Sequence, residues 1–378
     1  MIAAYLQIPT LILLLAVFLW NAKGVYWNDK YNDKSTTSII NGLFVCLVFI
    51  HHFGKRTGGE VVNYVGEYMG QLVVVTFLFY SGYGCMVQLR KRGYSYLASF
   101  PRRRILPFVM NYWVFAAVYA VLAFAVGRRF SFSQLLLSFT SWTGVGYNIV
   151  AGGGYWYVFA IVFLFIMFYL ALKMVYLCNL WGGGGRLIEN CFPKLSGLIT
   201  GVIIIGVSII IMAFALHGHK HPLWYNTMLV FLFGVIYGAF YEKIGGFLRS
   251  NLWAYLVVTI ACVLVVIASE RLPFSVISFS IKAIAFAFAV VLISMKIQLQ
   301  SPFLQWCGAH VTPIYFYQQL SLNAIATIDF GLDGLWRWWF YFIACGFITL
   351  MIAALYPRFQ VKPDSRMLKW LTPIDNFF

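Results

Sequence analysis

Long apolar runs separated by short polar segments make up nearly the whole chain of 378 residues. Each run has about the length that a helix needs to cross a hydrocarbon core roughly 30 Å thick. The pattern therefore predicts an all-α fold, a polytopic transmembrane helix bundle with eleven spans. Their approximate bounds are residues 3–20, 38–53, 71–89, 105–126, 155–177, 197–216, 223–241, 253–269, 274–295, 311–328 and 336–356.

Composition supports a membrane protein and argues against a soluble one. Hydrophobic residues make up 62% of the chain and charged residues 10%, with a mean hydropathy of +0.82, whereas a soluble domain has about 25% charged residues. We expect one membrane domain of about ten core helices at residues 38–356. An extra helix and a cytoplasmic loop precede it at 1–37, and a basic cytoplasmic tail follows at 357–378. Because the first span has no basic n-region and no A-x-A-like cleavage site, we interpret it as a retained helix.

The basic residues predict an orientation, because cytoplasmic loops retain Lys and Arg. Of the 27 basic residues, nineteen fall in loops on the side of the carboxyl terminus and seven on the opposite side, while Lys282 lies within a span. We therefore expect a multi-pass protein of the inner membrane with its amino terminus outside and its carboxyl terminus inside. The net charge of +16 is then mostly a topology signal, and no nucleic-acid partner is expected.

Two adjacent histidines, His51 and His52, end the second span. An imidazole is costly at membrane depth and can carry protons near neutral pH, so the pair is a functional candidate. Asn41 lies near the other end of the same span, about 16 Å away along a helix axis. Neighbouring side chains on a helix are separated by about 100°, so at most one of the two histidines faces the bundle interior. The alternative is an interfacial pair satisfied by water or carbonyl groups.

A run of three arginines, Arg102, Arg103 and Arg104, precedes the fourth span on the expected cytoplasmic side. Guanidinium groups bind phosphate in a bidentate manner and stay charged, so the run suits a ligand with several phosphates. An ordinary positive-inside anchor, or a contact with anionic lipid, is the competing interpretation.

Other polar and aromatic residues have weaker signals. Ser81 and Tyr83 lie among small residues that favour helix packing, and they also suit the lining of a cavity. Tyr155, Trp156 and Tyr157 follow three glycines at the end of the outer segment 127–154, which is typical of a flexible loop and an aromatic interface belt, or of a platform for a sugar ring.

Two further features involve ionisable side chains. The outer sequence HGHKH places His217, His219 and His221 at alternating positions, but no local carboxylate accompanies them, so no metal site is expected. Lys282 lies within the ninth span. Three roles are open: its side chain snorkels to the membrane surface, pairs with another residue, or contacts an anionic group of a substrate. The seven cysteines have no C-x-x-C pair and are interpreted as packing residues.

Several segments together resemble acyltransferase family 3, the integral-membrane acyltransferases that modify envelope glycans. An Arg-Gly pair and a histidine eleven residues after the arginine are typical of the family. Asn41, Gly42 and His52 have that spacing, with asparagine in place of the arginine. The FFxxSGY-like helix is matched by FLFYSGY at 77–83, and the basic motif by the arginine run and its following Leu-Pro and Tyr-Trp pairs. A later aromatic segment is matched at 155–157. Gly308 and Tyr315 fit a late motif in which Gln318 replaces a histidine.

The resemblance, which covers about residues 38–356, implies transfer of an acetyl or other short acyl group from cytosolic acyl-CoA to a hydroxyl of a glycan or lipid-linked saccharide. It implies His52 as general base, or less simply as acyl acceptor. Arg102 to Arg104, with Asn41, would hold acyl-CoA. The residues implied for the acceptor or its cavity are Ser81, Tyr83, Trp156, Tyr157, Lys282, Tyr315 and Gln318. Acyl-CoA is then a substrate, and no permanently bound cofactor or metal is expected.

Two alternatives remain open at this point. A transporter or flippase of a lipid-linked or polymeric glycan also needs a helix bundle with polar residues near both faces. A membrane scaffold without catalytic activity would have a dispensable His52.

Overall fold

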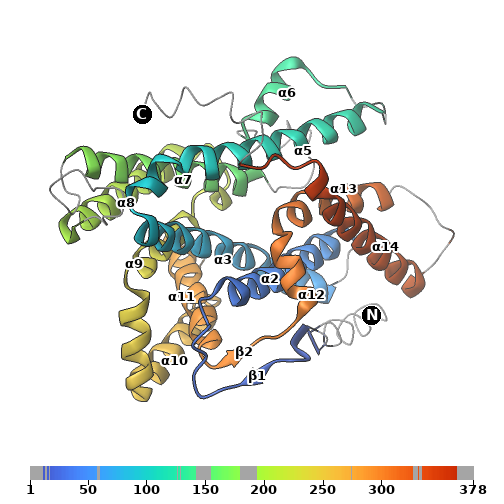
Figure 1. Ribbon diagram of the computed structural model, residues 1–378. Helices are drawn as coiled ribbons and strands as arrows, with labels where there is room; N and C mark the ends of the chain where they lie inside the picture. Colours follow the sequence, from blue (N-terminus) through green and yellow to red (C-terminus); the bar gives the residue numbers. More distant parts are fainter. Residues whose placement is uncertain are drawn as a thin grey trace. The chain divides into compact units, whose positions relative to one another are not determined.

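The computed structural model describes residues 12, 15–16, 18–57, 60–125, 127, 129–141, 155–178, 194–273, 275–326, 331 and 334–363, and nearly all of its regular structure is helical (Figure 1). The long helices are α2 (Lys34–Thr57), α3 (Glu60–Arg92), α5 (Leu106–Ala125), α7 (Tyr155–Leu177), α8 (Leu195–Leu216), α9 (Met228–Ser250), α10 (Leu252–Ser269), α11 (Val276–Ser294), α13 (Val311–Ala326) and α14 (Gly334–Leu355). The shorter elements are α4 (Tyr94–Ala98), α6 (Phe132–Phe139), α12 (Pro302–Ala309), the π-helical turn η1 (Pro101–Ile105), the 3-10 turns η3 (Pro222–Trp224) and η4 (Tyr356–Arg358), and the strands β1 (Lys23–Gly24) and β2 (Ile297–Gln298). The predicted all-α membrane fold is confirmed.

Nine segments of the described residues are long and apolar enough to cross a membrane, by length and composition. The first of the eleven predicted spans lies largely outside the described residues. The tenth corresponds to α13, whose 16 residues are fewer than the roughly 20 that a straight crossing requires. Helix ends also differ, because α3 and α9 extend beyond the apolar windows that predicted them.

The outer segment 127–154 contains the helix α6, which was not predicted from the sequence. Ser131 and Gln134 form a reciprocal capping box: the Gln134 amide donates to Ser131 Oγ at 3.3 Å, and the Ser131 amide donates to Gln134 Oε1 at 2.9 Å. Such a box satisfies two free amides and fixes the start of α6. The glycines that precede Tyr155 lie outside the described residues.

Two compact units make up the chain. Unit 1 comprises Met1–Phe77, Leu248–Leu272 and Ala285–Phe359. Unit 2 comprises Leu78–Phe247, Pro273–Ile284 and Gln360–Phe378.

In unit 1, α2 and α12 approach until their backbones touch. A Cβ atom added to Gly42 would overlap the carbonyl of Leu304, and one added to Gly308 would overlap the carbonyl of Ser38. Ser38 Oγ also donates to the Gln305 carbonyl at 3.1 Å. Small residues at such crossings allow the dispersion contacts and interhelical hydrogen bonds that hold membrane helices together.

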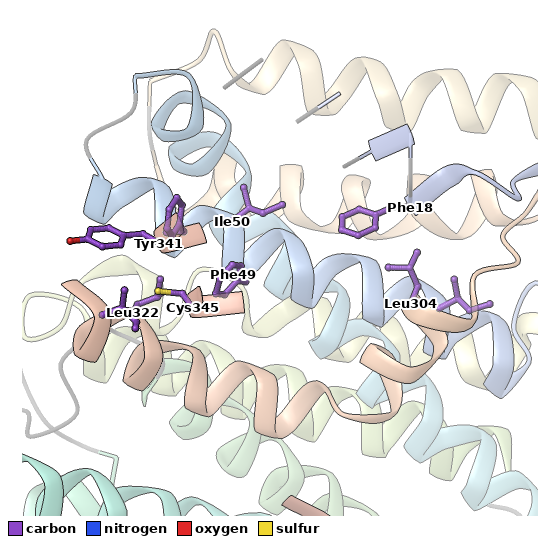
Figure 2. Packing of buried hydrophobic residues seen from close by; sticks show 10 residues of the cluster. Phe18, Phe49, Ile50, Leu304, Leu322, Tyr341 and Cys345 are labelled. Carbon is purple, nitrogen blue, oxygen red and sulfur yellow. The ribbon is translucent and has the colours of Figure 1, made fainter. Parts of the chain in front are cut away.

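An apolar cluster in unit 1 includes side chains of α2 (Figure 2). Phe49 and Ile50 of α2 lie with Leu322 of α13 and with Tyr341 and Cys345 of α14. Because lipid tails are as apolar as these side chains, close packing rather than release of water stabilises the cluster. The strands β1 and β2 pair antiparallel in the same unit (Figure 1).

Unit 2 contains an equally close crossing of α3 and α9. A Cβ atom at Gly82 would overlap the Phe231 carbonyl, and one at Gly234 would overlap the Phe79 carbonyl. At the end of α3, Arg90 pairs with Glu242 of α9 at 2.7 Å. The predicted packing role of the small residues around Ser81 is therefore visible at Gly82.

Peripheral helices present apolar surface. On α10, Tyr255 is the buried residue, whereas Trp253 is 78% exposed and Val257 is 63% exposed. On α8, Ile211 and Phe214 are exposed in the same way. Such surface is expected where side chains contact lipid instead of water.

Candidate functional site

In unit 1, helix α2 carries two candidate site residues, Asn41 and His52. It is continuous from Lys34 to Thr57, and its first turn is anchored where the Thr37 amide and hydroxyl bond to the Asp33 carbonyl. Eleven residues are about three full turns with an offset of only about 20°. Asn41 and His52 therefore share one face of α2, about 16 Å apart.

The two histidines have different surroundings. A Cβ atom added to Gly70 of α3 would lie 2.6 Å from the His51 ring, so the absent side chain of this glycine makes room for that imidazole. Both histidines are partly exposed, and the centroids of their rings lie 5.0 Å apart. His51 is thus a packing partner of α3, while His52 shares the face of Asn41.

Asn41 is partly buried, and its Oδ1 atom is inaccessible and has no hydrogen-bond partner within the described part of the chain. A buried acceptor left unpaired costs about 1–3 kcal/mol. Native proteins keep few such groups, and each requires an explanation such as a ligand or an ordered water.

Helix α13, which packs against α2 and α14, contributes a second such acceptor. Gln318 is 1% exposed, and its Nε2 donates to the Tyr315 carbonyl at 3.1 Å. That bond leaves Oε1 buried and without a partner among the described residues. Tyr315 is also buried. Unit 1 therefore contains two amide oxygens, on neighbouring helices, that can accept hydrogen bonds from a ligand.

The arginine run lies in unit 2, in the π-helical turn η1 that leads into α5. Short π-helical segments occur often at functional sites. Arg103 and Arg104 are exposed and Arg102 is partly exposed. Burial raises the pKa of the Tyr96 phenol, and the nearby Arg104 guanidinium partly opposes this shift. The turn thus carries three positive charges, and that of Arg104 lies near the buried Tyr96.

In unit 2, Ser81 of α3 lies close to Tyr157 and its neighbour Trp156 on α7, whereas Tyr83 of α3 packs against α9. The Tyr157 phenol lies within hydrogen-bonding reach of Ser81, and the Trp156 ring meets it edge to face at 6.2 Å between centroids. The Tyr83 ring lies 5.7 Å from that of Tyr237 on α9. Tyr83 and Trp156 are buried, with 8% and 9% of their surface exposed, so these rings are packed among other side chains.

Lys282 is enclosed by protein. It is 6% exposed, and its Nζ lies 5.9 Å from the centroid of the Phe279 ring on the same helix. A side chain held in this way does not extend to the membrane surface as a snorkelling lysine would.

The HGHKH segment forms local contacts. The Nδ1 atom of His217 lies 3.2 Å from the Tyr225 hydroxyl, and Nδ1 of His221 accepts from the Leu223 amide at 3.3 Å. In the described ranges, His, Cys, Asp and Glu side chains nowhere gather in a group of three or more that could hold a metal ion.

The predicted residues divide between the units. Unit 1 contains His52, Asn41, Tyr315 and Gln318, and unit 2 contains the remaining candidates. Sequence reasoning missed Gly70, whose role depends on a histidine in another helix. It also missed Tyr94, Lys173 and Tyr176, which come together in unit 2 although they are far apart in the sequence.

Long apolar helices and internal polar groups define a polytopic membrane protein. A family model described as an acyltransferase domain matches residues 5–356. The chain therefore belongs to acyltransferase family 3, and it is a membrane acyltransferase. The match includes the first predicted span, which the resemblance noted above did not. No curated protein and no solved structure matches the chain significantly.

Proposed function

We propose that the protein is a membrane O-acyltransferase that moves an acetyl or other short acyl group from cytosolic acyl-CoA to a hydroxyl of an envelope glycan or lipid-linked saccharide. The observation that carries this proposal is the arrangement of α2. One helix presents Asn41, whose Oδ1 has no hydrogen-bond partner among the described residues, and His52 on the same face about three turns apart. In a protein of the inner membrane with its amino terminus outside, Asn41 lies toward the donor side and His52 toward the acceptor side.

His52 is the proposed general base. Neutral imidazole removes the proton from the acceptor hydroxyl as the oxygen attacks the thioester carbonyl. The carbon–sulfur bond then breaks, and the CoA thiolate leaves and takes up a proton. The acyl group ends as an ester on the acceptor, and His52 is regenerated when its proton is released.

The other residues bind the substrates in this proposal. Arg102, Arg103 and Arg104 hold the CoA phosphates, because guanidinium groups match phosphate geometry. Asn41 Oδ1 and Gln318 Oε1 accept hydrogen bonds from a substrate. We assign Ser81, Tyr83, Trp156 and Tyr157 to the acceptor because hydroxyl and aromatic groups suit a saccharide, and the buried Lys282 suits an anionic group on the acceptor.

Replacing all three arginines of η1 with glutamine is expected to weaken acyl-CoA binding at least tenfold, because three phosphate-binding groups lose their charge. The measurements are the Kd of CoA in detergent and the transfer of label from radiolabelled acetyl-CoA to envelope glycan by membranes. Insertion, followed by the amount of protein in the membrane, should remain normal.

The matched control replaces Lys91 and Arg92, an exposed basic pair at the end of α3, with glutamine. This variant should keep its CoA affinity. An equal loss in both variants, or unchanged affinity in the triple variant, would return the arginine run to an anchoring role. Failure of the wild-type membranes to transfer label from acetyl-CoA would refute the proposed donor.

Asn41→Leu separates a ligand-binding role from a structural one. Because Oδ1 has no partner in the described residues, its removal should not lower the thermal stability. The KM for acetyl-CoA should nevertheless rise about tenfold, since the substrate loses a hydrogen bond. A lower melting temperature with unchanged KM would show that Asn41 serves the fold.

A further inference from the structure

Three side chains in unit 2, Tyr94, Lys173 and Tyr176, connect α4 to α7 and have no role in the proposed reaction. The rings of Tyr94 and Tyr176 stack with centroids 3.9 Å apart and an interplanar angle of 21°. Lys173, one turn before Tyr176, donates from Nζ to the Tyr94 hydroxyl at 2.7 Å. All three side chains remain partly exposed.

The lysine also gives the stack a positive charge. Its Nζ lies 5.2 Å from the Tyr94 centroid and 5.9 Å from the Tyr176 centroid. The stacked tyrosines thus form a partly exposed aromatic pair with a lysine ammonium group beside it. Burial of apolar surface alone would not require either the phenol hydroxyl or the ammonium group.

The segment that carries the arginine run, η1, also packs against α7. Both α4 and η1 pack against α7, and only seven residues separate Tyr94 from Arg102 in the sequence. The stacked tyrosines and the segment that carries the guanidinium groups are therefore both in contact with α7. The ligand chemistry that matches both is a planar base joined to several phosphates, which is the chemistry of a nucleotide.

We propose that the Tyr94–Tyr176 pair is the platform on which the adenine base of acyl-CoA stacks, with Lys173 holding Tyr94 in place. The proposal rests on the proposed function, because it assumes that the Arg102 to Arg104 run binds the phosphates of the same molecule. Bases stack on aromatic side chains without a fixed hydrogen-bond pattern. The platform therefore positions the nucleotide end of the donor, while the arginines bind its charge.

The test uses the full-length protein in detergent and the fluorescent donor analogue 1,N6-etheno-CoA. Its fluorescence should be quenched on binding to the wild type, as expected for a base stacked on tyrosine. Tyr176→Leu should abolish the quenching and weaken CoA binding about tenfold, the order expected when one base-stacking contact is lost. Tyr176→Phe keeps the ring and should retain both properties.

A competitor that lacks the adenine base distinguishes a lost stacking contact from a general loss of folded protein. The affinity for 4′-phosphopantetheine, which lacks adenosine, should change less than twofold in Tyr176→Leu. Tyr94→Leu, on the other helix, should reproduce the effect, so the test survives if one variant fails to fold.

Two outcomes overturn the proposal in distinguishable ways. Unchanged quenching and CoA affinity in the two leucine variants, with binding lost in the arginine triple variant, would refute the platform and leave the proposed function intact. No binding of etheno-CoA to the wild type would refute both.

Discussion

His52→Ala is expected to lower the rate of acyl transfer by at least a hundredfold, while the Kd of acyl-CoA changes less than twofold. A positioned general base contributes about 10²–10⁴ to a rate, and His52 is not among the groups proposed to bind the donor phosphates. Transfer of label from radiolabelled acetyl-CoA to envelope glycan measures the first quantity. Titration with CoA in detergent measures the second.

His51→Ala is the matched control, because it removes the same side chain one position away. Its ring fills the space left by Gly70, so this variant should lose thermal stability and keep most of its activity per folded molecule. Equal transfer by wild type and His52→Ala would eliminate His52 as the base. A hundredfold loss in His51→Ala alone would assign that role to the other histidine.

Gly308→Ala is expected to disrupt unit 1 and to leave little folded protein. The added Cβ atom would overlap the Ser38 carbonyl, and a backbone carbonyl cannot rotate away as a side chain does. Helices α2 and α12 would have to separate, with loss of the 3.1 Å hydrogen bond from Ser38 to Gln305. Overpacking costs about 1–3 kcal/mol where side chains adjust, and we expect more at a backbone contact.

The measurements are the melting temperature and the monodisperse fraction after purification in detergent. Gly42→Ala, on the facing helix, should have the same effect because its Cβ atom would overlap the Leu304 carbonyl. Gly346→Ala is the control, since its nearest neighbour, a Phe49 ring atom, would lie 3.9 Å away. Near-normal stability in Gly308→Ala would mean that the two helices do not approach as closely as described.

His52→Ala changes a side chain of α2, whereas Gly308→Ala changes the packing of α2 against α12. His52 and Asn41 are useful only if α2 keeps its place, and the Gly42–Gly308 crossing fixes that place against α12. Gly308→Ala should therefore lose binding and catalysis together, whereas His52→Ala should lose catalysis alone. This contrast distinguishes a structural defect from a chemical one.

Local features of the fold followed well from the sequence. The apolar runs predicted the long helices because a membrane helix satisfies its own backbone hydrogen bonds and needs only length and hydrophobicity. The α6 helix was missed, although Ser131 and Gln134 have the spacing of a capping box. The ends of α3 and α9 were also missed, since polar residues continue these helices beyond the apolar window.

Only part of the candidate site could be predicted from the sequence. Spacing along α2 was sufficient to relate Asn41 to His52, because both belong to one helix whose geometry is regular. The choice between His51 and His52 was more difficult, since it depends on Gly70 of α3. The unpaired oxygen of Gln318 depends on the hydrogen bond that its own amide nitrogen makes to Tyr315.

The sequence by itself determined that this is a helical membrane protein, because hydrophobicity is a property of the chain alone, and the resemblance of its motifs to acyltransferase family 3 indicated an acyltransferase. Only the tertiary structure decided which histidine packs against Gly70, which glycines hold α2 against α12, and that Tyr94 stacks on Tyr176. These are contacts between residues distant in the chain. They depend on side-chain volume at helix crossings, where one added methyl group overlaps a backbone carbonyl, and hydropathy contains no such information.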